Sequence, residues 1–260
     1  MKRKWGQHFL ASQETVRRIV EAAGISPEDS VVEIGPGHGE LTRHYIERVR
    51  RAVLFEIDPR LAALLVERWG KDQGRVSVRQ EDIRDADFAG LGFDRPPVVL
   101  GNLPYYVSKP VVSRLIQWGG FNRAILMLQW EVVQRLLSGP GESAYSLMSV
   151  LFQLKARAEL IVKVEPSAFR PPPKVCSAVI RMVPVDSGME ATPRFERLLR
   201  AAFHSRRQKL INSLGHQLDL SKSELMERLM ALGISPEARP QEVTPSDYWR
   251  FFGALPRDVI

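Results

Sequence analysis

The chain has 260 residues, of which 44% are hydrophobic and 26% are charged. These values are ordinary for a folded protein with one large domain, or one domain and a small appendage. The single cysteine excludes a disulfide framework and a cysteine-based zinc site, and we expect no metal. No apolar run is long enough for a membrane helix, and the basic N-terminus is too polar for a secretory signal. A cytoplasmic location is therefore expected.

The net charge of +7 is consistent either with an inert basic surface or with a polyanionic partner. Charge alone does not separate RNA from DNA or from an acidic membrane. The basic residues form two clusters, at 2–4 and at Arg206, Arg207 and Lys209. Two clusters so far apart in sequence would suit a long phosphate track that is not specific for sequence.

Short apolar runs alternate with helical patterns from about residue 30 to residue 130. Such runs, without strict alternation, are typical of strands that are buried on both faces of a parallel sheet. This rhythm predicts an α/β fold with a doubly wound, mostly parallel sheet. We expect strands over 30–35, 52–57, 76–81, 97–102 and 124–129, and helices over 12–23, 39–48, 59–70 and 108–117.

Two more strand-like runs follow, at 156–164 and 177–184. The proline-rich segment between them is too short for a helical crossover, so we expect antiparallel pairing at one sheet edge. Residues 185–193 are rich in turn formers and indicate a linker. Only helical patterns follow, so we expect a catalytic domain over 1–187 and a small all-α domain over 188–260.

A glycine-rich loop follows the first strand of the predicted sheet. Gly35, Gly37 and Gly39 alternate with other residues, which lets the backbone turn sharply and approach a ligand closely. Such a loop can also be only a tight turn, or a dinucleotide site. The dinucleotide fingerprint has a different spacing, GxGxxG, and Glu33 and Glu40 would repel a pyrophosphate.

Carboxylates stand at the ends of the next two strands. Glu56 follows the second strand and can accept hydrogen bonds from both hydroxyls of a ribose. Asp82 follows the third strand and can accept from an adenine amino group, while Ile83 covers the base. A cofactor that has a ribose, an adenine and a positive charge but no phosphate fits best. This set therefore favours S-adenosylmethionine.

The fourth strand ends in a segment with the residue types needed to methylate an adenine amino group. The amide oxygen of Asn102 and the main-chain carbonyl of Leu103 or Pro104 can accept the two amino hydrogens and direct the nitrogen lone pair at the methyl donor. Tyr105 can stack on the target base, and Phe169 is a candidate for its other face. Alone, the segment could be a strand-to-loop turn, and Phe169 a buried ring beside a rigid loop.

Seven motifs together resemble the ribosomal RNA adenine dimethyltransferase family, and the resemblance covers nearly the whole chain. They are GQHFL (6–10), EIGPGHGELT (33–42), EID (56–58), ED (81–82), NLPYYVSKP (102–110), FRPPPKVCSAVI (169–180) and FHSRRQKLINSL (203–214). The resemblance implies a Rossmann-like class I methyltransferase domain, a helical C-terminal domain and two methyl transfers to each target adenine. It also implies which residues contact the cofactor: Gln7, His8, Leu10, Gly35, Gly37, Glu56, Asp82, Ile83 and Asn102, the last shared with the target.

The C-terminal tail resembles the bacterial small-subunit branch of this family. That branch acts on two adjacent adenines in the 3′-terminal hairpin loop of 16S rRNA, so the implied partners are small-subunit rRNA and the 30S particle. An Erm-type enzyme of 23S rRNA, a DNA adenine methyltransferase and an assembly factor in which binding outweighs catalysis are the alternatives. We expect a monomer, because basic surfaces repel one another.

Overall fold

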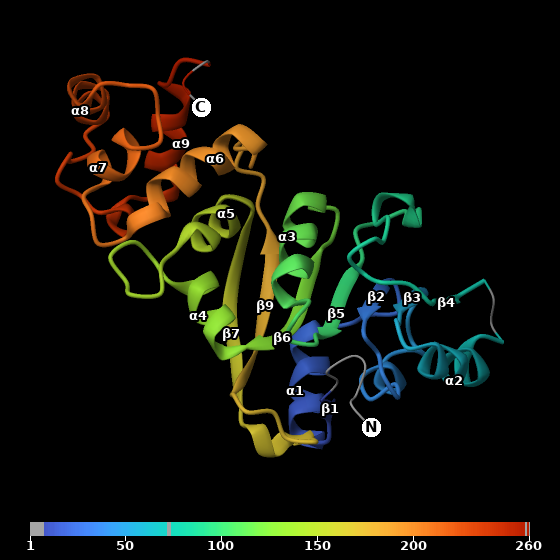
Figure 1. The fold of residues 1–260 in the computed structure, drawn as a ribbon. Coiled ribbons are helices and arrows are strands. Elements are labelled where there is room, and N and C mark those ends of the chain that lie inside the picture. The colour runs from blue at the N-terminus through green and yellow to red at the C-terminus, as the bar shows by residue number, and fades with distance from the viewer. Residues whose placement is uncertain (1–7, 72–73, 258, 260) are drawn as a thin grey trace. The chain divides into compact units, whose positions relative to one another are not determined.

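A seven-stranded sheet forms the centre of the first part of the chain (Figure 1). The computed structural model describes residues 8–71, 74–257 and 259. The strand order is β4-β3-β2-β5-β6-β9-β7, and neighbouring strands from β4 to β6 pair in parallel. The parallel strands are β2 (Ser30–Ile34), β3 (Arg51–Phe55), β4 (Val76–Arg79), β5 (Val98–Asn102) and β6 (Arg123–Gln129).

The parallel strands form because their side chains are apolar on both faces. Val31, Val53 and Leu100 have no solvent exposure, and all five expected strands are confirmed within two residues. Three of the four expected helices are also confirmed: α1 (Gln13–Ala23), α2 (Pro59–Trp69) and α3 (Ser108–Trp118). Asp58 caps α2 by accepting from the Arg60 N–H, which fixes the turn directly after β3.

The expected helix over 39–48 is wrong. This segment forms turns around a short 3₁₀ helix, η1 (Thr42–His44). Several of its backbone bonds span three residues, as from Tyr45 N to Thr42 O. The side chains of Thr42 and Tyr45 both donate to one oxygen of the buried Glu33, at 2.7 and 2.6 Å. Two donors three residues apart that converge on one atom favour these tight turns over a regular helix.

The last two strands close one edge of the sheet. β9 (Ser177–Pro184) pairs antiparallel with β6, and β7 (Ala156–Val164) lies beyond it at the edge. The prediction that these two strands lie at one edge of the sheet is confirmed. Antiparallel pairing is confirmed for β9, which pairs with β6. Between β7 and β9, the chain forms η3 (Pro166–Ala168) and β8 (Phe169–Arg170), and β8 pairs antiparallel with β1 (Phe9–Leu10). This small ribbon brings Phe9 and Leu10 to the Phe169 loop.

The chain divides into two compact units, and the division differs from the expected boundary at 187/188. The second unit contains 134–156 as well as 185–260. The reason is burial, because Tyr145, Val150 and Leu154 belong to the same core as Leu199 and Phe251. Apart from Ala156 at the start of β7, the regular elements in the described part of this unit are helices. They are most of α4 (Trp130–Leu137), α5 (Leu147–Lys155), α6 (Pro193–Ala202), α7 (Leu210–Gly215), α8 (Lys222–Ala231) and α9 (Pro245–Gly253), with the short η4 (Phe203–Ser205) and η5 (Pro240–Glu242). None of the helices in the described residues is long and apolar enough to cross a membrane.

Candidate active site

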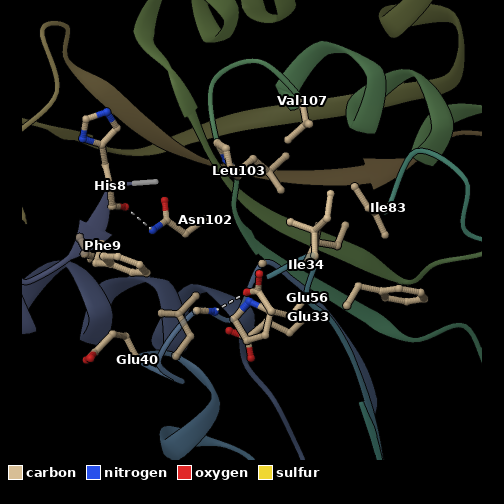
Figure 2. A pocket seen from close by; sticks show the side chains of 18 of the residues that line it. His8, Phe9, Glu33, Ile34, Glu40, Glu56, Ile83, Asn102, Leu103 and Val107 are labelled. Atoms are coloured by element: carbon tan, nitrogen blue, oxygen red, sulfur yellow. Dashed lines mark hydrogen bonds between the residues drawn. The ribbon is translucent and has the colours of Figure 1, made fainter. Parts of the chain in front are cut away.

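A pocket lies at the carboxyl ends of β2, β3, β4 and β5, entirely within the first unit. It has about 990 Å³ of empty space, including its open mouth, which is enough for a nucleoside-sized ligand. Figure 2 shows it from close by. Its lining includes every described residue that the sequence assigned to the site: His8, Leu10, Gly35, Gly37, Glu56, Asp82, Ile83, Asn102, Leu103, Pro104, Tyr105 and Phe169. Gln7 lies outside the described residues.

The glycine-rich loop needs glycine for its backbone shape. Gly35, Gly37 and Gly39 have φ angles of 67°, 60° and 83°, a region that other residues rarely adopt. The Phe9 ring also packs closely on the loop, since a Cβ on Gly37 would stand 3.2 Å from it. The ring contacts His38 as well, with centroids 4.7 Å apart. Residues 8–10 therefore cover one side of the pocket.

Glu56 is buried, with 3% exposure, and holds the loop in place. One carboxylate oxygen accepts from the Gly37 N–H and the other from the Asp58 N–H, both at 3.0 Å. Burial raises the pKa of Glu56, and these two N–H groups partly offset that effect. Each carboxylate oxygen can accept about two hydrogen bonds. The two oxygens together therefore retain capacity for two more donors.

Asp82 is held by its neighbour Arg84. The Arg84 Nε lies 3.0 Å from both carboxylate oxygens, and the Arg84 main-chain N–H also donates to one of them, at 2.9 Å. This pairing lowers the pKa of Asp82, so the group stays a charged acceptor. Ile83 is 7% exposed and supplies an apolar wall beside it. Tyr106, which is 48% exposed, also lines the pocket.

Glu33 is a second buried carboxyl group at the base of the pocket. It accepts from the hydroxyls of Thr42 and Tyr45, and desolvation raises its pKa to about 7. From the sequence, Glu33 was expected to carry a full negative charge. Near neutral pH it is instead part protonated, because burial disfavours the ionised form.

Asn102 ends β5, and one weak contact orients its side chain. Its Nδ2 points to the main-chain carbonyl of His8, at a long distance of 3.5 Å, so the amide oxygen faces the other way (Figure 2). The main chain is held after it too, since the Leu103 N–H donates to Met127 O at 3.3 Å. The Pro104 carbonyl accepts from the Val107 N–H and from the hydroxyl of Ser108, at 3.1 and 3.3 Å. These two bonds use much of its acceptor capacity.

Two aromatic side chains of the candidate site differ in exposure. Tyr105 is half-buried, its hydroxyl lies 3.1 Å from the Ser177 hydroxyl, and its ring stacks on His8 with centroids 5.6 Å apart. Desolvation raises the pKa of Tyr105, so it stays protonated at neutral pH. Phe169 is 3% exposed and belongs to the hydrophobic core, although part of it lines the pocket. This position is consistent with both interpretations of Phe169, as a ring that stacks on the target base and as a buried ring that packs beside a rigid loop.

Sequence reasoning missed several lining residues. Phe9 and Tyr106 were not assigned to the site, and Glu33 and Glu40 were considered only as charges that would repel a pyrophosphate, yet all four line the pocket. Two of them could have been predicted from their position in the sequence, because Glu33 lies near the end of β2 and Tyr106 directly follows Tyr105. Phe9 gave no such signal, since its contact with Gly37 depends on how the N-terminal segment folds back.

The pocket is strongly acidic. Five carboxyl groups line it, and its lining contains no lysine or arginine among the residues that the structure describes. The five are Glu33, Glu40, Glu56, Glu81 and Asp82. Arg84 and Arg43, which do not line the pocket, pair with Asp82 and Glu40, and Glu33 is part protonated, so the net charge is smaller than five. With no cation in the described lining, the pocket still favours a ligand without phosphate, or one with a positive charge. Within the same described residues, no cluster of three or more His, Cys, Asp or Glu side chains could hold a metal ion.

Solved structures share this fold. A crystal structure of a dimethyladenosine transferase from Plasmodium falciparum has a TM-score of 0.80 and 26% identity, covering 94% of this chain and 96% of that one. A crystal structure of the 23S rRNA methyltransferase ErmE has a TM-score of 0.71 and 26% identity, covering 95% of this chain and 99% of that one. The mostly parallel sheet, the glycine loop and the pocket at the strand ends define a class I methyltransferase.

Sequence comparison gives the family. A family model described as "Ribosomal RNA adenine dimethylase" matches residues 1–255, so the chain belongs to this family. "Ribosomal RNA small subunit methyltransferase A" of Caldanaerobacter subterraneus subsp. tengcongensis is 34% identical over 98% of this chain and 97% of its own length. The protein of the same name from Aromatoleum aromaticum is 38% identical over 95% of this chain and 91% of its own.

Proposed function

We propose that the chain is a 16S rRNA adenine N6-dimethyltransferase that takes methyl groups from S-adenosylmethionine and has a role in small-subunit biogenesis. The targets are two adjacent adenines in the 3′-terminal hairpin loop. The observation that carries the proposal is that Asn102 to Tyr105 line a pocket with five carboxyl groups and no lysine or arginine among its described lining residues. Such a site favours a cationic methyl donor, and the segment from Asn102 to Tyr105 can bind an adenine amino nitrogen beside that donor.

The residues of the pocket fit this cofactor. Glu56 retains two acceptor positions for two vicinal ribose hydroxyls, and Asp82 is a charged acceptor for an adenine amino group. Ile83 covers the adenine ring, and Gly35 and Gly37 let the main chain approach the ligand. When bound, S-adenosylmethionine supplies a methyl group that its sulfonium already activates. A general base is therefore not required before transfer.

Asn102 and one main-chain carbonyl orient the target nitrogen. The Asn102 amide oxygen faces away from His8 and accepts one amino hydrogen of the adenine. Of the two carbonyls considered, that of Leu103 is favoured for the second hydrogen, because the Pro104 carbonyl already accepts two bonds. In the first transfer, holding both hydrogens would direct the lone pair at the methyl group; the N–C bond forms as the S–C bond breaks, and the methylated nitrogen then loses one proton to solvent. In the second transfer one hydrogen remains to be held, and in both the rate comes from positioning and fixed dipoles. Tyr105 and Phe169 hold the flipped base between them.

The choice of small-subunit RNA rests on the relatives that carry that name at 34% and 38% identity. An exposed basic cluster in the second unit supports contact with RNA. Arg206 and Arg207 are exposed, although Arg206 also donates to the Ser143 carbonyl, and Lys209 pairs with Glu237. We propose a monomer that acts on the 30S particle in the cytoplasm, where its acidic pocket takes the cofactor and its basic surface takes the RNA.

Transfer of labelled methyl groups to naked rRNA, to small subunits and to large subunits, each in a separate reaction, tests this proposal. We expect label in small-subunit RNA, with N6,N6-dimethyladenosine as the labelled nucleoside and no label with Asn102→Ala. Label confined to large-subunit RNA would show an Erm-type enzyme. Tight binding to small subunits without methyl transfer would show that binding outweighs catalysis in this protein.

A further inference from the structure

All acceptor positions of the Asp82 carboxylate are in use. Three N–H groups of Arg84 make four contacts with it, two at each oxygen. One oxygen accepts from the main-chain N–H at 2.9 Å and from Nε at 3.0 Å, and the other accepts from Nε at 3.0 Å and from Nη2 at 2.6 Å. Each carboxylate oxygen can accept about two hydrogen bonds. The count that leaves two free positions on Glu56 therefore leaves none on Asp82.

The proposed cofactor contact needs one of these positions. Asp82 lines the pocket, and the adenine amino group of the cofactor is proposed to donate to its carboxylate. Arg84 contacts the same carboxylate but does not itself line the pocket. A donor that reaches Asp82 from the pocket therefore has to replace one of the four contacts that Arg84 makes.

The main-chain and side-chain contacts of Arg84 differ in how easily they break. The main-chain N–H belongs to a turn that is closed by a hydrogen bond of 2.9 Å from the Asp85 N–H to the Asp82 carbonyl. The side chain of Arg84 is 50% exposed, and within the described residues its hydrogen bonds go to Asp82 alone. A guanidinium that turns into water is rehydrated, so an exposed pair of this kind contributes little free energy. The side chain is therefore the group that the amino group displaces.

We propose that the Arg84 side chain competes with the adenine of the cofactor for Asp82, and that it thereby sets the affinity and the base specificity of the cofactor site. The inference rests on the proposed function and adds what the adenine must displace. The main-chain N–H of Arg84 still holds Asp82 after the side chain leaves, so the carboxylate keeps its orientation. Because the new contact replaces an existing one, the site gains less from the amino group of adenine than a free carboxylate would.

Two substitutions and a matched control test the competition. Arg84→Ala removes the side chain and keeps the main-chain N–H, whereas Arg84→Lys keeps the charge but has one nitrogen in place of the fork. Arg60→Ala is the control, because Arg60 donates to Asp58 from its main-chain N–H at 3.0 Å and from its guanidinium at 3.4 Å, and Asp58 does not line the pocket.

Calorimetry gives the Kd of S-adenosylhomocysteine and of S-inosylhomocysteine, in which a carbonyl replaces the amino group of the base. Both ligands carry no net charge, so loss of the positive charge of Arg84 has little direct effect on them. Each Kd is measured at about 0.1 M and about 1 M salt, because salt screens an exposed ion pair. Thermal unfolding shows whether each variant is folded.

We expect Arg84→Ala to bind S-adenosylhomocysteine about 1.5- to 5-fold more tightly than wild type at low salt, the range for an exposed ion pair. Its preference over S-inosylhomocysteine should rise by a similar factor, and both differences from wild type should shrink at high salt. Arg84→Lys should lie between the two, and Arg60→Ala should bind as wild type does.

Unchanged or weaker binding by Arg84→Ala would overturn the proposal and would show that the side chain only orients Asp82. An equal gain in Arg60→Ala would also overturn it, because the effect would then come from charge in general. Failure of the proposed function would instead show in the wild type, which would then not bind S-adenosylhomocysteine.

Discussion

Replacing Glu56 by glutamine changes one oxygen of a buried carboxylate into an NH₂ group. The carboxylate accepts one N–H from Gly37 and one from Asp58, each at 3.0 Å. The amide can accept only one of them and turns a donor towards the other. A buried N–H without an acceptor costs about 1–3 kcal/mol. For a chain of this size, that cost lowers Tm by roughly 2–12 °C.

The same substitution should weaken cofactor binding. A hydrogen bond from a ribose hydroxyl to a charged oxygen contributes about 1.5–3 kcal/mol, so its loss raises Kd on the order of 10- to 150-fold. Calorimetry with S-adenosylhomocysteine and with its 2′-deoxyribose analogue distinguishes loss of the contact with the ribose hydroxyl from a general distortion of the glycine loop. Wild type should discriminate between the two ligands, and Glu56→Gln should discriminate much less. The exposed Glu67→Gln is the matched control. An equal preference of wild type and Glu56→Gln for the hydroxylated ligand would refute the assigned contact.

Two further predictions concern charge. Arg206→Ala combined with Arg207→Ala should weaken RNA binding and reduce the slope of log K against log salt by roughly 1.4, about 0.7 for each lost phosphate contact. The exposed pair Arg17→Ala with Arg18→Ala should leave the slope unchanged, and an equal slope in both double variants would place the phosphate track elsewhere. Glu33 has its pKa raised from 4.5 to about 7, so wild-type stability from this group is complete below pH 4.5 and falls as the pH rises to 7. The shift in pKa corresponds to about 3 kcal/mol of unfolding free energy. Urea unfolding of wild type and Glu33→Gln at pH 5 and 7.5 checks it. The free energy of unfolding of wild type relative to the variant should be smaller at pH 7.5, and a constant difference would contradict the raised pKa.

The parallel sheet could be predicted from the sequence because its strands are apolar on both faces. Once five such strands are placed, parallel topology brings their carboxyl ends to one edge. Glu56, Asp82 and Asn102 were predicted to meet for that reason, and all three line one pocket. The prediction needed no contact between distant segments beyond the pairing of neighbouring strands.

Features that depend on side-chain contacts could not be predicted in the same way. The helix expected over 39–48 is replaced by turns because Thr42 and Tyr45 converge on Glu33. The pairing of Asp82 with Arg84 is local, but only the folded geometry shows that it uses both carboxylate oxygens. The boundary between the two units differs from the expected one because residues 134–156 pack into the helical core. Helical periodicity does not say which core a helix joins.

Contacts across long sequence separations were the least predictable. His8 and Pro171 are 163 positions apart, and their hydrogen bond depends on the ribbon of β1 and β8. Two strands of two residues each carry too little pattern to be recognised in a sequence. The resemblance to a family placed His8 at the site, but its contacts with Tyr105 and Pro171 come from the structure alone.

Asn102→Ala tests the central claim most directly, that Asn102 orients the target nitrogen for methyl transfer. The measurement is single-turnover methyl transfer to small-subunit RNA, with the Kd of S-adenosylmethionine determined on the same preparation. Loss of one preorganised dipole at a reacting centre costs about 100- to 1000-fold in rate. We predict a loss of at least that size with a Kd within a few-fold of wild type. Equal losses in rate and in cofactor affinity would mean that Asn102 is structural, and would contradict the claim.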